Sequence, residues 1–165
     1  MTIPAPIFDA DHRLSLNFTL REFTASQTAV RRGIRNVPTA EHIRNMEALC
    51  REVLEPVRAQ FGHPVRITSG YRSAALNRAI GGSGTSQHSN GEAADFEITG
   101  IDNRVVARWI AGNLTFDQLI LEGYRAGDPN SGWVHVSYSG LRNRARRQVL
   151  TATFPGPRYS AGIAA

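Results

Sequence analysis

The stretch WVHVS, residues 133–137, decides the fold, because its two valines alternate with His135 along an extended chain. Side chains of a strand point alternately to its two faces, so the valines share one face and the histidine lies on the other. The stretch AADFEI, residues 93–98, alternates in the same way around Asp95. Both stretches therefore predict strands with one face in a core and a polar residue near the middle of the opposite face.

Helical patterns precede most of the strand patterns along the chain. Helices are predicted from the capping box at Thr19, from Thr39 to Gly62 with a kink or break at Pro56, at 73–80 and at 102–112. The remaining strands are predicted at 65–68, 116–122, 133–138 and 147–153. This order favours an α+β fold with a small, mostly antiparallel sheet and helices packed on one side.

The length of 165 residues fits one domain. We expect an N-terminal arm at 1–18, the domain itself at 19–153 and a loose C-terminal tail at 154–165. A hydrophobic content of 41% excludes a disordered chain, and no apolar run approaches the ~18 residues of a membrane span. The start of the sequence has no basic stretch followed by an apolar run, so no secretory signal peptide is expected.

Charge and cysteine content narrow the function classes. The net charge is +5, and all 19 basic residues are arginine. A basic surface suggests an anionic partner, and the use of arginine alone is equally explained by the base composition of the genome. The single cysteine, Cys50, excludes a disulfide framework and a cysteine-cluster zinc site. It falls on the apolar stripe of the helix at 39–62, where we expect it to be a core residue.

Two histidines and one aspartate lie where a plain core would not place them. Asp95 and His135 project from the polar faces of two strands, and His88 lies in the glycine-rich loop at 81–91, from which it can close the site. Two imidazoles and one carboxylate are a common ligand set for catalytic zinc, with a fourth position left for water. The same set also suits other divalent ions of similar size. Spacing alone equally allows a surface histidine and two unrelated polar residues.

A longer run of motifs surrounds these residues and resembles the peptidase M15 family. The motifs are TSGYRS at 68–73, LN at 76–77, GG at 81–82, SQHSNGEAAD at 86–95 and WVHVS at 133–137. The likeness extends over about residues 16–150 and is greatest to the short, phage-type branch. The pairing of S-x-H-x-x-G-x-A-x-D with a later W-x-H is a specific signature.

The resemblance implies a zinc-dependent peptidoglycan peptidase with His88, Asp95 and His135 as ligands of Zn²⁺. It also implies the compact fold that this family shares with lysostaphin-type peptidases and the hedgehog signalling domain. The expected substrates are stem peptides, cut at a bond to a D-amino acid or between L-Ala and D-Glu. We expect a monomer that binds neither nucleic acid nor membrane. It would be made in the cytoplasm and would reach the wall at lysis, in a virion or by injection.

One position departs from the family pattern. Many members carry a catalytic Glu or Asp three residues before the last histidine, and Gly132 stands there in this chain. Glu122 offers a replacement if the strand at 116–122 pairs antiparallel with the strand at 133–138 so that Glu122 lies opposite Trp133. A register slip of one residue would turn the carboxylate to the wrong face. Asp128 is the second candidate, and the absence of any such base is the third possibility.

Three further residues are candidates for contact with the substrate. Arg72 matches the family's S-G-Y-R arginine, which the resemblance assigns to binding the substrate carbonyl or carboxylate, and a guanidinium there would stabilise an oxyanion. Ser86 and Ser137 flank the expected zinc ligands and are candidate substrate-binding residues.

Two rival functions remain open at the level of sequence. The first is a non-catalytic zinc-containing structural or wall-binding module of a virion, which the missing acid at Gly132 favours. The second is a basic nucleic-acid binder, which has no supporting motif beyond the arginine group at 142–147. That group fits anionic wall polymers equally well.

Overall fold

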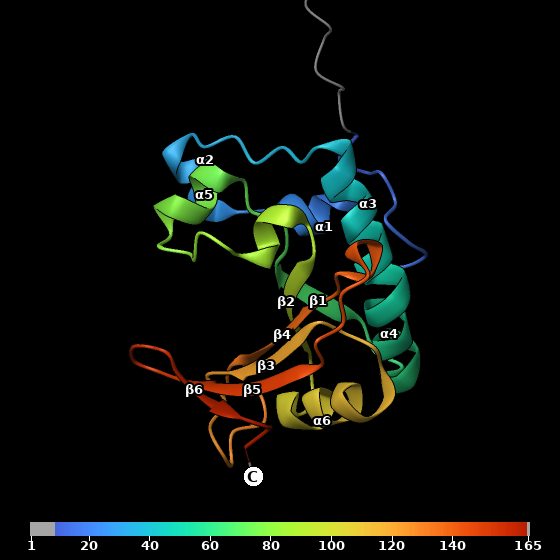
Figure 1. Cartoon of the computed structure of the whole chain (residues 1–165), viewed down its shortest axis with the longest axis vertical. Helices are drawn as coiled ribbons and strands as arrows, with labels where there is room; N and C mark the ends of the chain where they lie inside the picture. The colour runs from blue at the N-terminus through green and yellow to red at the C-terminus, as the bar shows by residue number, and fades with distance from the viewer. Residues whose placement is uncertain (1–8, 165) are drawn as a thin grey trace, which may run out of the picture.

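The computed structural model describes residues 9–164 as one α+β unit (Figure 1). Its α-helices are α1 Leu20–Thr24, α2 Gln27–Arg32, α3 Ala40–Leu49, α4 Glu55–Phe61, α5 Ala74–Ala79 and α6 Asn103–Asn113. Its strands are β1 Val65–Ser69, β2 Ala93–Ile98, β3 Gln118–Glu122, β4 Trp133–Ser137, β5 Gln148–Thr153 and β6 Arg158–Ala161. The shorter elements are a π-helical segment η1 Cys50–Leu54 and two 3₁₀ turns, η2 Gln87–Asn90 and η3 Gly140–Arg142.

The six strands form one sheet in the order β1-β2-β4-β3-β5-β6. All neighbouring pairs are antiparallel except β3 and β5, which are parallel. The predicted α+β class and mostly antiparallel sheet are therefore confirmed in general terms. The register predicted for the two central strands is also confirmed, because Glu122 pairs with Trp133.

The core lies against one face of this sheet. Phe96, Leu119 and Val134 point to that face and are fully buried, together with apolar residues of α3, η1, α4 and α6. In Figure 1, α6 lies beneath the sheet and the α3–α4 helix runs along its side. The alternation of the strands leaves the opposite face to the polar residues, which is where Asp95 and His135 lie.

The long helix predicted at 39–62 forms with an internal irregularity. Thr39 caps it by accepting a hydrogen bond from the backbone N–H of His42, and Gly62 ends it in a left-handed conformation. The π-helical segment η1 comes immediately before Pro56, whose missing N–H interrupts regular α-helical bonding. Cys50 lies in this segment and is fully buried, as its place on the apolar stripe predicts.

The segments expected at the two ends of the chain carry more structure than the sequence suggested. Leu14 and Phe18 are buried in the core, and β6 pairs with β5 inside the expected tail. Glu22 accepts hydrogen bonds from the backbone N–H and hydroxyl of Thr19, which fixes the junction of residues 9–18 with α1. Residues 1–8 and 165 of the expected arm and tail lie outside the described residues. The division into arm, domain and tail stays a prediction.

Within residues 9–164, none of the helices combines the length and the apolar character needed to cross a membrane.

Candidate metal centre and cleft

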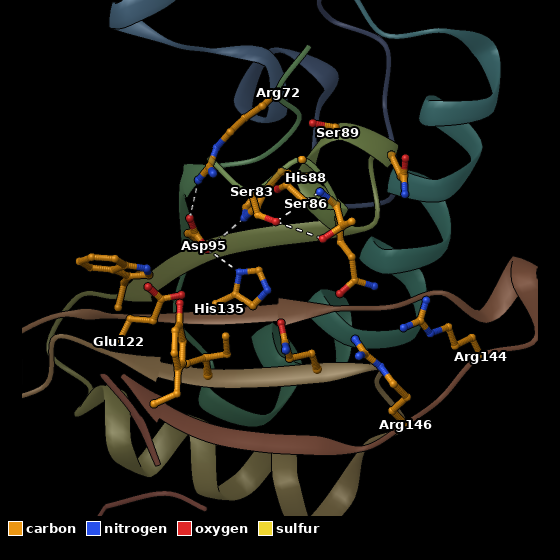
Figure 2. Close-up of a pocket in the computed structure, with 18 of the residues that line it drawn as sticks. Arg72, Ser83, Ser86, His88, Ser89, Asp95, Glu122, His135, Arg144 and Arg146 are labelled. Atoms are coloured by element: carbon orange, nitrogen blue, oxygen red, sulfur yellow. Dashed lines mark hydrogen bonds and ion pairs between the residues drawn. The ribbon is translucent and has the colours of Figure 1, made fainter. Parts of the chain in front are cut away.

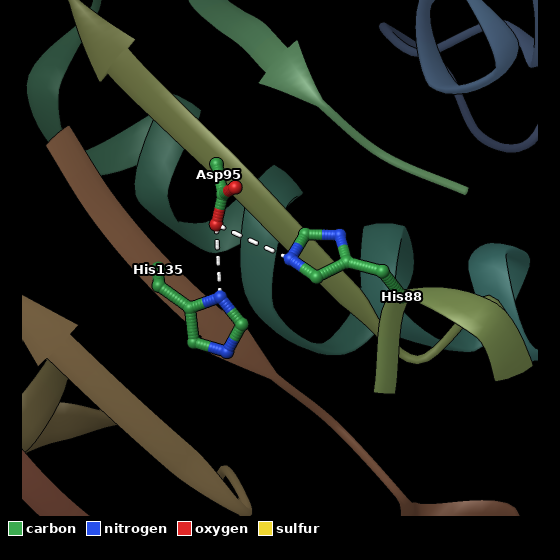
Figure 3. Close-up of side chains that lie close together, drawn as sticks. All are labelled: His88, Asp95 and His135. Carbon is green, nitrogen blue, oxygen red and sulfur yellow. Dashed lines mark hydrogen bonds and ion pairs between the residues drawn. The ribbon is translucent and has the colours of Figure 1, made fainter. Parts of the chain in front are cut away.

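Three side chains from three separate elements meet on the polar face of the sheet (Figure 3). Asp95 in β2 pairs across the sheet with His135 in β4, and His88 reaches over them from the 3₁₀ turn η2. Asp95 Oδ1 lies 2.8 Å from His135 Nδ1 and 3.3 Å from His88 Nε2. All three residues are buried, and one possible ligand atom of each lies within 4.8 Å of the others. The sequence prediction that these residues converge is thus matched by the geometry.

The loop histidine is held by a backbone carbonyl. His88 Nδ1 lies 2.7 Å from the carbonyl oxygen of Gly70, which can only accept, so Nδ1 carries the proton. The neutral imidazole then keeps its lone pair on Nε2, the atom that faces Asp95. Gly70 is required there, because a Cβ would lie 2.6 Å from the backbone oxygen of Phe23.

An arginine holds the other oxygen of the central carboxylate. Arg72 Nη2 donates to Asp95 Oδ2 at 2.9 Å, and Arg72 Nε donates to Ser69 Oγ at 2.9 Å. The β1–β2 register shifts between Ile67 and Ser69, and this irregularity brings Ser69 opposite Asp95. The guanidinium therefore fixes the rotation of the Asp95 carboxylate and leaves Oδ1 to the two histidines.

The electrostatics of the cluster favour a metal-ligating state. Burial lowers the pKa of His88 below its ordinary value and favours the neutral imidazole, against the opposing effect of Asp95. Burial alone would raise the pKa of Asp95, but His88 and His135 outweigh it and hold that pKa well below its usual range. A neutral imidazole beside an ionised carboxylate is the protonation state that a divalent cation requires. The donor set is two nitrogens and one oxygen, and these residues could hold a metal ion.

Glu122 approaches this cluster from the end of β3. It pairs with Trp133 and lies two residues along β3 from Ile120, the partner of His135, so Glu122 and Ile120 share a face. Burial raises the pKa of the Glu122 carboxyl, and the negative charge of Asp95 raises it further against the opposing effects of His135 and Arg72. A carboxylate with a raised pKa near a metal position is suited to proton transfer.

The backbone around Gly132 explains why no side chain is present at that position. Gly132 has a φ of +66°, and a Cβ there would lie 1.9 Å from the backbone oxygen of Glu122. The β3–β4 connection therefore packs directly on the backbone of residue 122. This close approach leaves no room for a side chain at position 132.

The cluster lies in a cleft of about 930 Å³ that runs along β3 (Figure 2). Figure 2 shows Glu122 at one end, His135 between, and Arg144 and Arg146 at the other end. The lining residues are Arg72, Ser83, Gly84, Thr85, Ser86, Gln87, His88, Ser89, Asn90, Asp95, Gln118, Ile120, Glu122, Trp133, His135, Arg142, Arg144, Arg146 and Tyr159. Arg72, Ser86 and Glu122 thus share one cleft with the possible metal ligands.

Two residues singled out from the sequence lie elsewhere. Ser137 is fully buried, accepts a hydrogen bond from the backbone N–H of Gln118 at 3.0 Å, and does not line the cleft. The sequence predicts that Ser137 and His135 share a face of the strand, but in the structure the neighbouring strand β3 covers the Ser137 hydroxyl. Asp128, the second candidate for a base, pairs with Arg125 at 2.9 Å in the β3–β4 connection and does not line the cleft either.

Sequence reasoning missed the walls of the cleft. Tyr159 comes from β6, in the segment expected to be loose, and Phe154 stacks on Trp133 with ring centroids 5.8 Å apart. Arg142, Arg144 and Arg146 were noticed only as a basic group. Strand periodicity could not have placed them, because Arg142 ends the turn η3 and Asn143 has a left-handed backbone conformation.

Comparison with known families agrees with the motif content. A family model described as Peptidase M15 matches residues 16–137, which cover the three possible metal ligands together with Arg72 and Glu122. A search of curated proteins finds no match to this chain. The matched range ends before the arginines at 142–146 and before β6.

Proposed function

The chain belongs to the peptidase M15 family of metallopeptidases, and from this premise we propose that it is a zinc-dependent peptidase of peptidoglycan. The observation that carries the proposal is the meeting of His88, Asp95 and His135 in one cleft with Glu122. The proposed reaction is hydrolysis of a peptide bond in the stem peptide or cross-link. Both a D,D-carboxypeptidase or endopeptidase and an L-Ala–D-Glu peptidase fit this description.

Zinc fits the donor set better than a harder cation. Imidazole nitrogens suit zinc, whereas magnesium and calcium prefer sets made of oxygen alone. The separation of His88 Nε2 and Asp95 Oδ1 is 3.3 Å, and that of His135 Nδ1 and Asp95 Oδ1 is 2.8 Å. When bound, zinc would supply Lewis acidity that activates a water and polarises the scissile carbonyl.

Glu122 is proposed as the general base and acid. Its carboxylate takes a proton from the attacking water and later returns it to the leaving amine. The proposal rests on the Glu122–Trp133 pairing, which turns Glu122 to the face of His135. The backbone contact at Gly132 supports placing the base at Glu122 rather than at 132, because position 132, where the family usually has the acid, has no room for a side chain.

Arg72 is proposed to have a positioning role toward Asp95. The hydrogen bond from Nη2 to Asp95 fixes the carboxylate that would hold the metal. Arg72 also lines the cleft, which is compatible with the sequence prediction that it contacts the substrate carbonyl or carboxylate. That contact stays a prediction.

The peptidoglycan substrate is supported by the family and by the polar lining of the cleft. The hedgehog-like details of the fold, the phage-type origin, the monomeric state and action on the wall outside the cytoplasm stay predictions that accompany this proposal. The rival, a zinc-containing module without catalysis, stays open, and the presence of Glu122 in the cleft favours the peptidase over it.

The experiment that tests the proposal is digestion of defined muropeptides by the zinc-loaded protein, with the products identified by mass spectrometry. We expect one peptide bond to be cut, and we expect a chelator to stop the reaction and added zinc to restore it. Glu122→Gln is expected to retain zinc and to lose roughly 10²–10⁴-fold in rate, the usual contribution of a general base.

Two outcomes would contradict the proposal in different ways. A zinc-loaded protein that releases no new amine from any muropeptide would favour the non-catalytic module. A Glu122→Gln variant with the wild-type rate would leave the peptidase in place but remove the base assignment.

A further inference from the structure

The cleft has a second charged region at the end away from Glu122. Arg142, Arg144 and Arg146 line this end and follow one another at intervals of two residues, from the last residue of η3 toward the start of β5. The segment lies outside the range 16–137 that the family model matches, so family membership does not assign it a role. The three arginines differ in what they contact, and the difference singles out one of them.

Two of the arginines are bound by buried carboxylates. Arg142 makes two hydrogen bonds to Glu92, at 2.7 and 2.6 Å, and the Glu92 side chain is 1% exposed. Arg146 makes two side-chain hydrogen bonds to Asp117, at 2.9 and 2.8 Å, and the Asp117 side chain is fully buried. Paired, two-point bonding of this kind fixes a guanidinium and satisfies its charge.

Arg144 lies between them, and the one carboxylate within 4 Å of it among residues 9–164 is distant. Its Nε is 3.5 Å from Asp117 Oδ1, an oxygen that already accepts from Arg146, and its side chain is 43% exposed. Three guanidinium groups thus share two buried carboxylates, and Glu41 adds a weaker attraction to Arg142, so the excess positive charge falls on Arg144. A partly exposed positive charge that no carboxylate holds at two points attracts an anion from solution.

The neighbouring arginine shows that the excess is not a general property of the segment. Arg147 has a positive φ of 52° and turns to the other side, where it donates to the backbone oxygens of Leu114 and Ala111 at the end of α6. Its position is explained by the fold, whereas that of Arg144 is not.

We propose that Arg144 is an anion-binding residue of the cleft and that it takes a carboxylate group of the peptide substrate. The inference rests on the proposed peptidase function and deepens it. Asp117, which anchors Arg146, directly precedes β3, and Gln118 at the start of β3 lies two residues from Ile120, the partner of His135. Asp117 itself is three residues from Ile120, an offset of about 10 Å along the strand, so the carboxylate belongs about two or three residues from the scissile bond.

Stem peptides offer free carboxylates at the D-glutamyl residue, at a diamino-acid residue and at the C-terminus. The chemistry that Arg144 recognises is the same in each case, because a guanidinium fork matches any carboxylate. The experiment therefore uses one stem peptide in four forms, namely unmodified or amidated at a single one of these carboxylates. Amidation removes the charge with little change in size.

The zinc-loaded wild-type protein, Arg144→Gln, Arg144→Lys and a control, Arg31→Gln, are compared on the four peptides. Arg31 lies exposed on α2, does not line the cleft and gives the same change of net charge. We expect Arg144→Gln to lower kcat/KM about tenfold on the unmodified peptide through KM, with kcat unchanged. We expect the effect to vanish on the one amidated form that lacks the recognised carboxylate, and Arg144→Lys to be intermediate.

An equal loss on all four peptides, or a loss no larger than that of Arg31→Gln, would overturn the proposal. So would a DNA oligonucleotide that binds in a salt-sensitive way through Arg144 while peptide kinetics stay unchanged. Calorimetric binding of the same peptides separates this proposal from the proposed function. If the peptides bind in an Arg144-dependent way but are not cleaved, the peptidase assignment is wrong and the anion site stands. If the peptides are cleaved at a rate that does not depend on Arg144, the anion site is wrong and the peptidase assignment stands. The absence of both binding and cleavage would contradict both proposals.

Discussion

Two aspartates beside the cleft, Asp95 and Asp117, are buried to a similar degree and have different partners. Asp95 is 7% exposed and shares its Oδ1 between His88 and His135. Asp117 is fully buried, and both of its oxygens accept hydrogen bonds from Arg146, with a further bond from Gln87. The Asp117 donors carry protons that they keep at neutral pH, whereas an imidazole has a form with a free lone pair.

This difference separates a possible metal ligand from a structural anchor. Burial of a carboxylate is common to both sites and identifies neither. At Asp95 the partners can exchange a proton for a cation, so the same three atoms can turn to a metal ion. At Asp117 the Arg146 guanidinium and the Gln87 amide occupy both oxygens, whereas at Asp95 the Arg72 guanidinium occupies only Oδ2.

The largest expected effect comes from removing a possible metal ligand beside Asp95, and it tests the difference between the two aspartates directly. His135→Ala removes one of three possible ligands, so we expect metal retention and muropeptide cleavage to be lost together. Asp117→Asn is the matched change at the other buried carboxylate and is expected to retain both. Metal content after gel filtration and the rise in Tm on adding zinc measure retention, because a metal that binds only the folded state stabilises it.

A His135→Ala protein that cleaves at the wild-type rate would contradict the metal centre. Equal loss of metal in Asp117→Asn would show instead that the two aspartates are not functionally distinct.

The next effect concerns the hydrogen bond from Arg72 to Asp95. Arg72→Ala frees the carboxylate to rotate, and loss of such an outer partner typically lowers metal affinity about 10–100-fold. Competition against a chromophoric chelator measures the change, and Arg72→Lys is expected to recover part of it. Unchanged metal affinity with a reduced kcat would assign Arg72 to the substrate oxyanion, as the sequence resemblance implies, rather than to Asp95.

The part of the molecule that could be predicted from sequence follows from strand periodicity. Alternation in 93–98 and 133–137 placed Asp95 and His135 on one face, and the pairing of Glu122 with Trp133 followed from a single choice of register. These features depend on local patterns and on one antiparallel pairing. The position of His88 was harder to derive, since it depends on the carbonyl of Gly70 in another loop.

The arginine end of the cleft and β6 could not be predicted in this way. β6 is exposed along its length, so it lacks the apolar alternation that marks a strand. The roles of Arg142 and Arg146 depend on Glu92 and Asp117, which are 50 and 29 residues away in sequence. Ser137 shows the converse limit, because periodicity gave its face but not the neighbouring backbone that covers its hydroxyl.

A smaller effect, on the free energy of unfolding, tests the structural role of Asp117. Asp117→Asn keeps the shape of the side chain but turns an amide N–H toward donors from Arg146 and Gln87. We expect the free energy of unfolding to fall by about 1.5–3 kcal/mol, the typical value of hydrogen bonds to a charged group. Glu97→Gln is the control, because its pair with Arg66 is exposed and such pairs contribute about 1 kcal/mol or less. Equal losses in the two variants, measured by urea denaturation, would remove the distinction between them.

The smallest effect is a difference in the acid dependence of stability. Burial raises the pKa of Asp117, but hydrogen bonds from Arg146 and Gln87 outweigh it and lower the pKa to about 2. The ordinary value for aspartate is about 3.9, so the folded state binds this proton less readily than the unfolded state does. The stability that Asp117 contributes is therefore complete above about pH 4 and is lost as the pH falls toward 2.

The measurement is made with a chelator present, so that metal release plays no part. We expect the wild-type protein to lose stability more steeply than Asp117→Asn between about pH 4 and pH 2. The slopes should differ by at most one proton, or about 1.4 kcal/mol per pH unit. Identical slopes would mean that the arginine pair does not hold the Asp117 carboxylate ionised.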